Sequence, residues 1–182
     1  MKTMNYKVFQ SLNFFSSQVP VYVMLIIWFI PSFSEFRFIE GILVFQLLVG
    51  ILSFFLLIKN INGQKISKNP ITVKLKLMTV KLDSAALPVL IPAMVAMLCK
   101  DRWLTGFACS VFIQIMMYFL TINSTDYLWN VLLSVMRVNV FKAIDVKSKR
   151  TYYCFSKIER LEDEVQCNKL SSGWLVYVNG MK

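Results

Sequence analysis

The feature that most constrains the fold is a run of 18 residues without any charge, 41–58, accompanied by further long apolar runs on either side. A helix of this length can cross the hydrocarbon core of a bilayer, which is about 30 Å thick. The chain as a whole is 57% hydrophobic and 16% charged, whereas soluble domains have roughly 25% charged residues. The sequence therefore predicts an integral membrane protein.

We predict an all-α membrane protein with four transmembrane helices and a small α+β cytoplasmic C-terminal tail. The four-helix domain covers 19–123, with spans over about 19–34, 41–58, 82–99 and 104–123. Pro88 and Pro92 should bend the third span. Small residues let helix backbones approach closely in a membrane, so we expect helix packing at Ala85, Ala93, Ala96, Gly106 and Ser110.

The two ends of the chain, 1–18 and 124–182, are predicted to lie outside the transmembrane domain. In residues 1–18, Val8, Leu12 and Phe15 recur at near-helical spacing, which favours an amphipathic helix at the membrane interface. A signal peptide is the competing interpretation, and we expect this segment to be retained. Residues 124–182 should form an interfacial segment and a small cytoplasmic domain, with a hairpin over 143–146 and 151–155 and a third strand over 174–178.

A basic loop, residues 59–81, separates the two apolar halves, and its charges predict the orientation. Sorting by the four predicted spans puts 17 of the 20 Lys and Arg residues on one side, in 1–18, in this loop and in 124–182. The positive-inside rule then places both termini and the loop in the cytoplasm. Within it, 71–82 alternates loosely as a strand would, but we favour a surface helix that aligns Val73, Leu77 and Val80.

The basic residues are candidate contacts for lipid headgroups or for a partner protein. A nucleic-acid patch is the alternative, but the loop lacks aromatic side chains on which bases could stack, so no direct nucleic-acid binding is expected. The candidates are Lys59, Lys65, Lys68, Lys74, Lys76, Lys81, Lys147, Lys149 and Arg150.

No catalytic, cofactor or metal constellation stands out. The chain has no His, and its four cysteines form no C-x-x-C motif. We therefore expect no enzyme activity, no cofactor and no metal. A lipid-modifying enzyme, with Asp83 and Asp101 as its best acidic candidates, is a poorly supported hypothesis. Isolated polar residues in the spans either join helices or line a pore: Gln46, Ser110, Gln114 and Thr121.

Two stretches carry a resemblance to a known family. The residues 80–95, VKLDSAALPVLIPAMV, and 126–146, DYLWNVLLSVMRVNVFKAIDV, together with the four-span layout and the basic second loop, resemble KwaA, the membrane subunit of the Kiwa anti-phage defence system. The resemblance implies a bacterial inner-membrane homo-oligomer that senses infection at the envelope and works with a cytoplasmic DNA-binding partner, KwaB.

The function we predict is therefore a non-enzymatic sensor or scaffold in the bacterial inner membrane. It would contact membrane lipids, copies of itself and a KwaB-like partner. A small channel or holin-like pore is the alternative.

Overall fold

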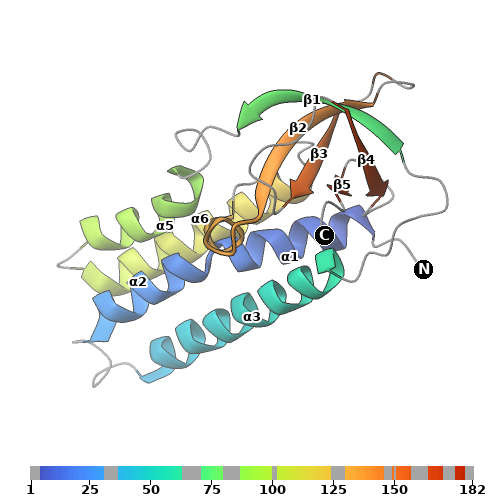
Figure 1. The fold of residues 1–182 in the computed structure, drawn as a ribbon. Coiled ribbons are helices and arrows are strands. Elements are labelled where there is room, and N and C mark those ends of the chain that lie inside the picture. Colours follow the sequence, from blue (N-terminus) through green and yellow to red (C-terminus); the bar gives the residue numbers. More distant parts are fainter. Residues whose placement is uncertain are drawn as a thin grey trace.

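The protein combines a bundle of helices with a small β-barrel that sits at one end of the bundle (Figure 1). This computed structural model describes residues 5–30, 37–62, 71–79, 87–99, 102–123, 130–145, 149, 151–156, 164–169 and 175–178. Within this part of the chain, three helical stretches are long and apolar enough to cross a membrane: Tyr6–Phe29, Arg37–Asn62 and Trp103–Asn123.

The first of these stretches consists of α1 (Tyr6–Ser17) and α2 (Val19–Phe29), joined almost without a break. Gln18 between them keeps a helical conformation, and its backbone N–H donates to the carbonyl of Phe14 at 3.2 Å. Pro20 lies in the first turn of α2, where a proline is tolerated because that N–H has no helical partner anyway. The two helices together therefore provide 24 residues of membrane-compatible length.

This arrangement differs from the predicted surface helix over 1–18. Three polar residues of α1, Asn13, Ser16 and Ser17, are completely buried inside the molecule. The polar side of α1 therefore contacts other helices and not water or headgroups. Residues 1–4, and 31–34 of the predicted first span, lie outside the described residues.

α3 (Arg37–Asn62) contains the predicted span 41–58 and extends it at both ends. Its buried residues recur at intervals of three, four or seven positions, which places them along one stripe; they are Ile39, Leu43, Gly50, Ser53, Leu57 and Ile61. This stripe packs against α1 and α2. Lys59 in the last turn of α3 is favourably placed near the negative end of the helix dipole.

α5 (Leu87–Leu98) and α6 (Trp103–Asn123) form an antiparallel pair. α6 matches the predicted span 104–123, whereas the described part of the predicted span 82–99 is a helix of 12 residues, about 18 Å long. That length is short of the roughly 20 residues that a span requires. Four spans are therefore not confirmed, and 82–86 lie outside the described residues.

Five strands close into a barrel in the order β1-β2-β3-β5-β4, with β1 pairing with both β2 and β4. All neighbouring pairs are antiparallel except β3 and β5, which are parallel. This is the strand arrangement of OB-type barrels. The strands are β1 (Ile71–Thr79), β2 (Asn139–Asp145), β3 (Thr151–Ser156), β4 (Glu164–Lys169) and β5 (Leu175–Val178).

The strand β1 corrects our preference for a surface helix over 71–82. Val73 pairs with Asp145 of β2 on one side and with Val165 of β4 on the other, so the backbone of β1 is used on both edges. These ladders outweigh the weak helical pattern, because tertiary pairing overrides local propensity. Part of the predicted loop thus belongs to the same barrel as the C-terminal tail.

The predicted hairpin of the tail is confirmed, because β2 and β3 pair in antiparallel register from Asn139 opposite Ser156 to Ile144 opposite Thr151. Lys149 in their connection has a positive φ of 54°, as turns often require. The third predicted strand, 174–178, corresponds to β5, with Trp174 outside the described residues.

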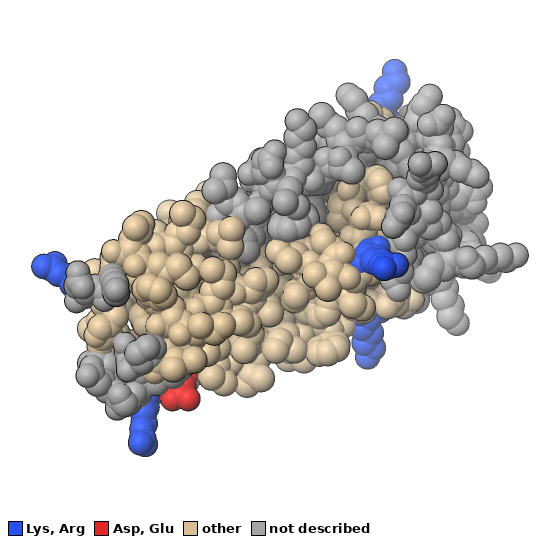
Figure 2. All heavy atoms as spheres, turned by 60° about the vertical axis from the view of Figure 1, so that its left-hand side comes forward, with Lys and Arg blue, Asp and Glu red and all other residues tan. Residues whose placement is uncertain are grey.

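Charged and apolar side chains are segregated along the molecule. On the face shown in Figure 2, the described Lys and Arg side chains lie toward the two ends of the molecule, and the described surface between them is uncharged. Outward-facing residues of α2, α3 and α6 are strongly exposed, for example Ile27, Phe45 and Phe112 at 63–67%. An exposed apolar surface of this extent indicates contact with lipid or with another protein.

α1 and α2 together form one nearly continuous helix, which we call the α1–α2 rod. Gly50 sets the distance between α3 and this rod. A Cβ added there would lie 2.7 Å from Val19 Cγ2 and 3.0 Å from the carbonyl oxygen of Phe15. We expect Gly50→Ala to lower the free energy of unfolding in mild detergent by about 1–3 kcal/mol, a typical cost of overpacking. The matched control is Gly41→Ala in the same helix, because nothing lies within 4 Å of that position. Equal stability of the two variants would contradict this packing.

Cys154 and Cys167 meet inside the barrel, where their Sγ atoms are 3.9 Å apart. The hydrogen bond with Cys167, and then burial, raise the pKa of Cys154 far above its ordinary value of 9.0. Since the thiolate is the reactive form, we expect N-ethylmaleimide at about pH 8 to leave Cys154 unmodified in the folded protein and to label it after unfolding. Mass spectrometry of the labelled peptide measures this, and equally fast labelling in both states would refute it.

Candidate functional site

A groove opens between the α1–α2 rod, α3 and α6 at the depth of the membrane-compatible helices. It encloses a cavity of about 410 Å³, within the size range of small-molecule sites. We call it the interhelical groove. Its lining residues are Phe14, Phe15, Tyr22, Phe45, Gln46, Val49, Val111, Gln114, Ile115 and Tyr118.

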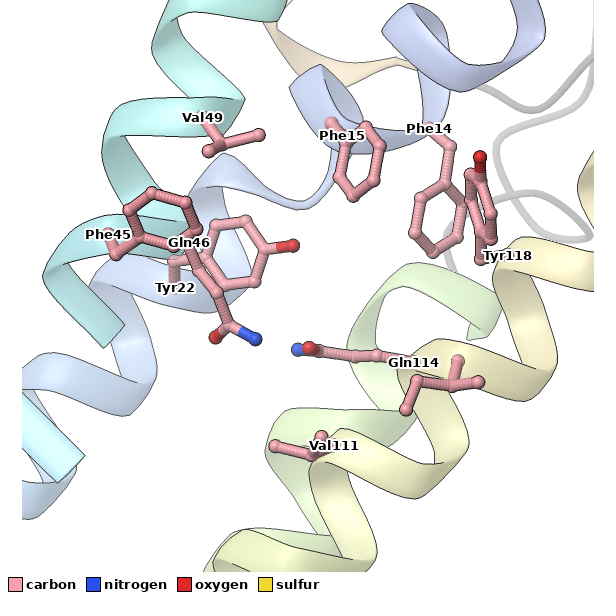
Figure 3. A pocket seen from close by; sticks show the side chains of 10 residues that line it. Phe14, Phe15, Tyr22, Phe45, Gln46, Val49, Val111, Gln114 and Tyr118 are labelled. Atoms are coloured by element: carbon pink, nitrogen blue, oxygen red, sulfur yellow. The ribbon is translucent and has the colours of Figure 1, made fainter. Parts of the chain in front are cut away.

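Two glutamines face each other across this groove, Gln46 from α3 and Gln114 from α6 (Figure 3). Gln114 is 94% buried, with 6% of its surface exposed. Gln46 Oε1 and Gln114 Nε2 are both buried, and neither has a hydrogen-bond partner among the residues that the structure describes. A buried polar atom without a partner costs about 1–3 kcal/mol, so both amides have unused hydrogen-bonding capacity within the described part of the chain.

The glutamines lie near mid-depth of the bundle. A helix rises about 1.5 Å per residue. Gln46 is therefore about 14 Å along α3 from Arg37, at the end of the bundle away from the barrel, and Gln114 is about 14 Å along α6 from Asn123, at the opposite end. Among the described residues, no Asp, Glu, Lys or Arg lines the groove. The described lining of the groove is therefore uncharged and largely apolar. The two amides lie at its centre, and the hydroxyls of Tyr22 and Tyr118 are its other side-chain hydrogen-bonding groups.

A second polar centre joins the bundle to the barrel. Asn130, which is 1% exposed, donates from Nδ2 to Ser16 Oγ at 2.6 Å and to Asn13 Oδ1 at 3.2 Å. Its Oδ1 accepts from the backbone N–H groups of Leu132 and Leu133 and so caps α7 (Val131–Val135). One side chain thus begins α7 and holds it against α1.

Apolar packing surrounds this polar centre. Phe9 of α1 and Phe155 of β3 are fully buried, and their rings meet edge to face with centroids 5.7 Å apart. Residues from α1, α3, α7 and the barrel share this cluster: Phe9, Leu57, Ile61, Leu133, Val138, Tyr153 and Phe155. The barrel is therefore packed firmly on the ends of α1 and α3.

α1 takes part in both sites. Phe14 and Phe15 line the groove, whereas Asn13 and Ser16, directly beside them in the sequence, bind Asn130. α1 thus connects the groove with α7, which leads into β2.

The predicted basic contact residues fall into two groups. Lys59, at the end of α3, and Lys149, between β2 and β3, are exposed, and Lys74 and Lys76 occupy positions on β1. All four belong to the barrel end of the molecule, opposite Arg37 and Arg102. The other predicted residues lie outside the described part: Lys65, Lys68, Lys81, Lys147 and Arg150.

The predicted packing residues lie between α5 and α6. Ala93, Ala96 and Ser110 are completely buried. A Cβ on Gly106 would lie 3.0 Å from the carbonyl oxygen of Ala96, so the two backbones are in close approach. Ala85 lies outside the described residues.

The four polar residues considered as pore lining do not share one path in the described structure. Gln46 and Gln114 line the groove, but Ser110 does not, and Thr121 donates back to the carbonyl of Met117 in its own helix. The contribution of Asn13, Ser16 and Asn130 was not predicted. Asn13 and Ser16 belong to the segment that was expected to lie at the membrane interface. Their partner, Asn130, is more than a hundred positions away in the sequence.

Asn130 offers a test of the joint between barrel and bundle. Asn130→Ser keeps an oxygen that can cap α7 but loses the amide that reaches α1. We expect the free energy of unfolding to fall by about 1–3 kcal/mol. We also expect faster amide exchange in 131–145, measured by hydrogen–deuterium exchange in mild detergent.

The matched control is Asn60→Ser, because the Asn60 amide donates to the carbonyl of Leu56 in its own helix. Indistinguishable exchange in the two variants would mean that Asn130 does not hold the barrel in place.

Comparison with known proteins identifies the family. The family model described as anti-phage protein KwaA matches residues 9–176. Searches of curated proteins and of solved structures give no match. Because the family model covers most of the chain, the chain belongs to the KwaA family of anti-phage proteins.

Proposed function

We propose that this KwaA-family chain is a non-enzymatic sensor and scaffold subunit of an anti-phage defence system in the bacterial inner membrane. It assembles with copies of itself and recruits a cytoplasmic DNA-binding partner of the KwaB type. The family supports a role in defence, and the three long apolar helices support membrane insertion.

The observation that carries the sensor proposal is the double role of α1. One face of this helix lines the groove within the membrane-compatible bundle, and its neighbouring residues bind Asn130 at the base of the barrel. A sensor needs such a mechanical link between the membrane and the compartment that responds. A simple membrane anchor would not require a buried side-chain connection between the two parts.

The arrangement supports a sensor better than a catalyst or a pore. The described residues that line the groove include no carboxylate and no cation with which to move a proton or activate a nucleophile. Two of the four candidate pore residues, Ser110 and Thr121, are not among the residues that line it. The outward apolar faces of α2, α3 and α6 offer surface for contacts between copies.

The barrel end is the proposed docking surface for the partner. It bears the exposed Lys59 and Lys149, and the excess of basic residues in the segments around it favours a cytoplasmic position. Positive charge at the rim of an interface accelerates association with an acidic surface.

Co-purification tests this proposal. The tagged full chain, expressed together with a soluble DNA-binding protein of the KwaB type, should retain that protein in mild detergent. We expect Lys59→Gln combined with Lys149→Asn to weaken retention and make it less salt-dependent; asparagine tolerates the positive φ of position 149. The control, Arg37→Gln with Arg102→Gln, removes two charges from the opposite end.

Two results of the co-purification would count against the proposal: no partner retained by the unaltered chain, or an equal loss of retention in the control. A third would be full protection of cells against phage by the Asn130→Ser variant, if hydrogen exchange of the purified variant shows that its barrel is detached.

A further inference from the structure

We propose that the interhelical groove binds one molecule of a neutral, membrane-dissolved lipid whose hydroxyl group is held between Gln46 and Gln114. A long-chain alcohol or a diacylglycerol has this chemistry. The inference goes beyond the proposed function, because binding in the groove requires neither a partner protein nor assembly.

The hydrogen-bonding groups of the groove define the polar part of the ligand. Gln46 and Gln114 point toward each other from opposite walls (Figure 3), and each has a buried amide atom without a partner among the described residues. Because every amide carries both a donor and an acceptor, the pair presents both kinds of group. A hydroxyl, which can donate to one amide while it accepts from the other, satisfies both.

The position of the glutamines defines the charge of the ligand. They lie near mid-depth of the helices, in a groove whose described lining residues carry no charge. An ionised headgroup placed there would lose its hydration without gaining a counter-ion, at a cost of several kcal/mol. The polar group is therefore neutral, which excludes the phosphate of a phospholipid and the carboxylate of a fatty acid.

The remaining lining defines the apolar part. Aromatic rings of Phe14, Phe15, Tyr22 and Phe45 surround the cavity. Phe45 is 67% exposed and Ile115 is 50% exposed, so the mouth of the groove opens toward the outer surface of the bundle, where the acyl chains of a bilayer would lie. A hydrocarbon chain can therefore enter from the bilayer.

The size of the cavity argues against a helix of a second copy. A helix about 10 Å in diameter with a 5.4 Å pitch fills roughly 400 Å³ in a single turn, and the cavity is about 410 Å³. It would accept one turn of a helix and not a span, whereas a lipid chain can leave the groove and continue into the bilayer.

Photolabelling tests the proposal with defined probes. The full chain in nanodiscs of bacterial polar lipids is exposed to hexadecanol with a diazirine in its chain, and to the corresponding diazirine alkane without the hydroxyl. We expect the alcohol to label groove residues at saturable concentration. Gln46→Leu combined with Gln114→Leu should weaken its apparent affinity by about tenfold or more, with labelling by the alkane weak and unaltered.

A second pair of variants tests the cavity itself. Val49→Phe fills the groove and should abolish labelling by the alcohol, whereas Leu48→Phe, at a neighbouring position that is 59% exposed and outside the groove lining, should leave labelling as in the unaltered chain. Three results would overturn the proposal: labelling spread along the outer faces of the helices, undiminished affinity in the double glutamine variant, or a disulfide between two copies through Val49→Cys, which would assign the groove to a second copy.

Discussion

The buried amide of Asn130 is the interaction on which the relation between barrel and bundle depends. Its nitrogen reaches Ser16 Oγ at 2.6 Å while its oxygen caps α7. Both halves of the amide are therefore satisfied inside a site that excludes water. Because an unsatisfied amide in such a site is costly, α7 cannot leave α1 without losing these contacts together with the packing of Phe9 on Phe155.

The long helices could be predicted from the sequence because length and the absence of charge decide them. α3 and α6 contain the runs 41–58 and 104–123. The role of α1 could not be predicted, because helical periodicity identifies a polar side without saying whether water or protein faces it. Here the polar side faces protein, so α1 joins the bundle and supplies the partners of Asn130.

The barrel shows the other limit of prediction from sequence. The pairing of β2 with β3 follows from a short connection between two β-prone segments, and it was predicted. The membership of β1 depends on partners on both sides that are distant in the chain. Likewise, Gln46 and Gln114 were recognised as isolated polar residues, but only the packing of the helices shows that they face each other.

The groove itself results from how small residues place the helices. Gly50 lets α3 approach the α1–α2 rod, and Gly106 lets α6 approach α5. α1 also meets α6 where Ser11 and Tyr118 lie 3.2 Å apart.

α3 and α6 are thus each fixed to other helices, and their glutamines are left apart. A hydroxyl between these amides would satisfy both of them. A bound ligand shifts the helices only if it interacts differently with two arrangements of them. Since α1 forms one wall and holds Asn130, occupancy of the groove and the position of the barrel would be physically linked.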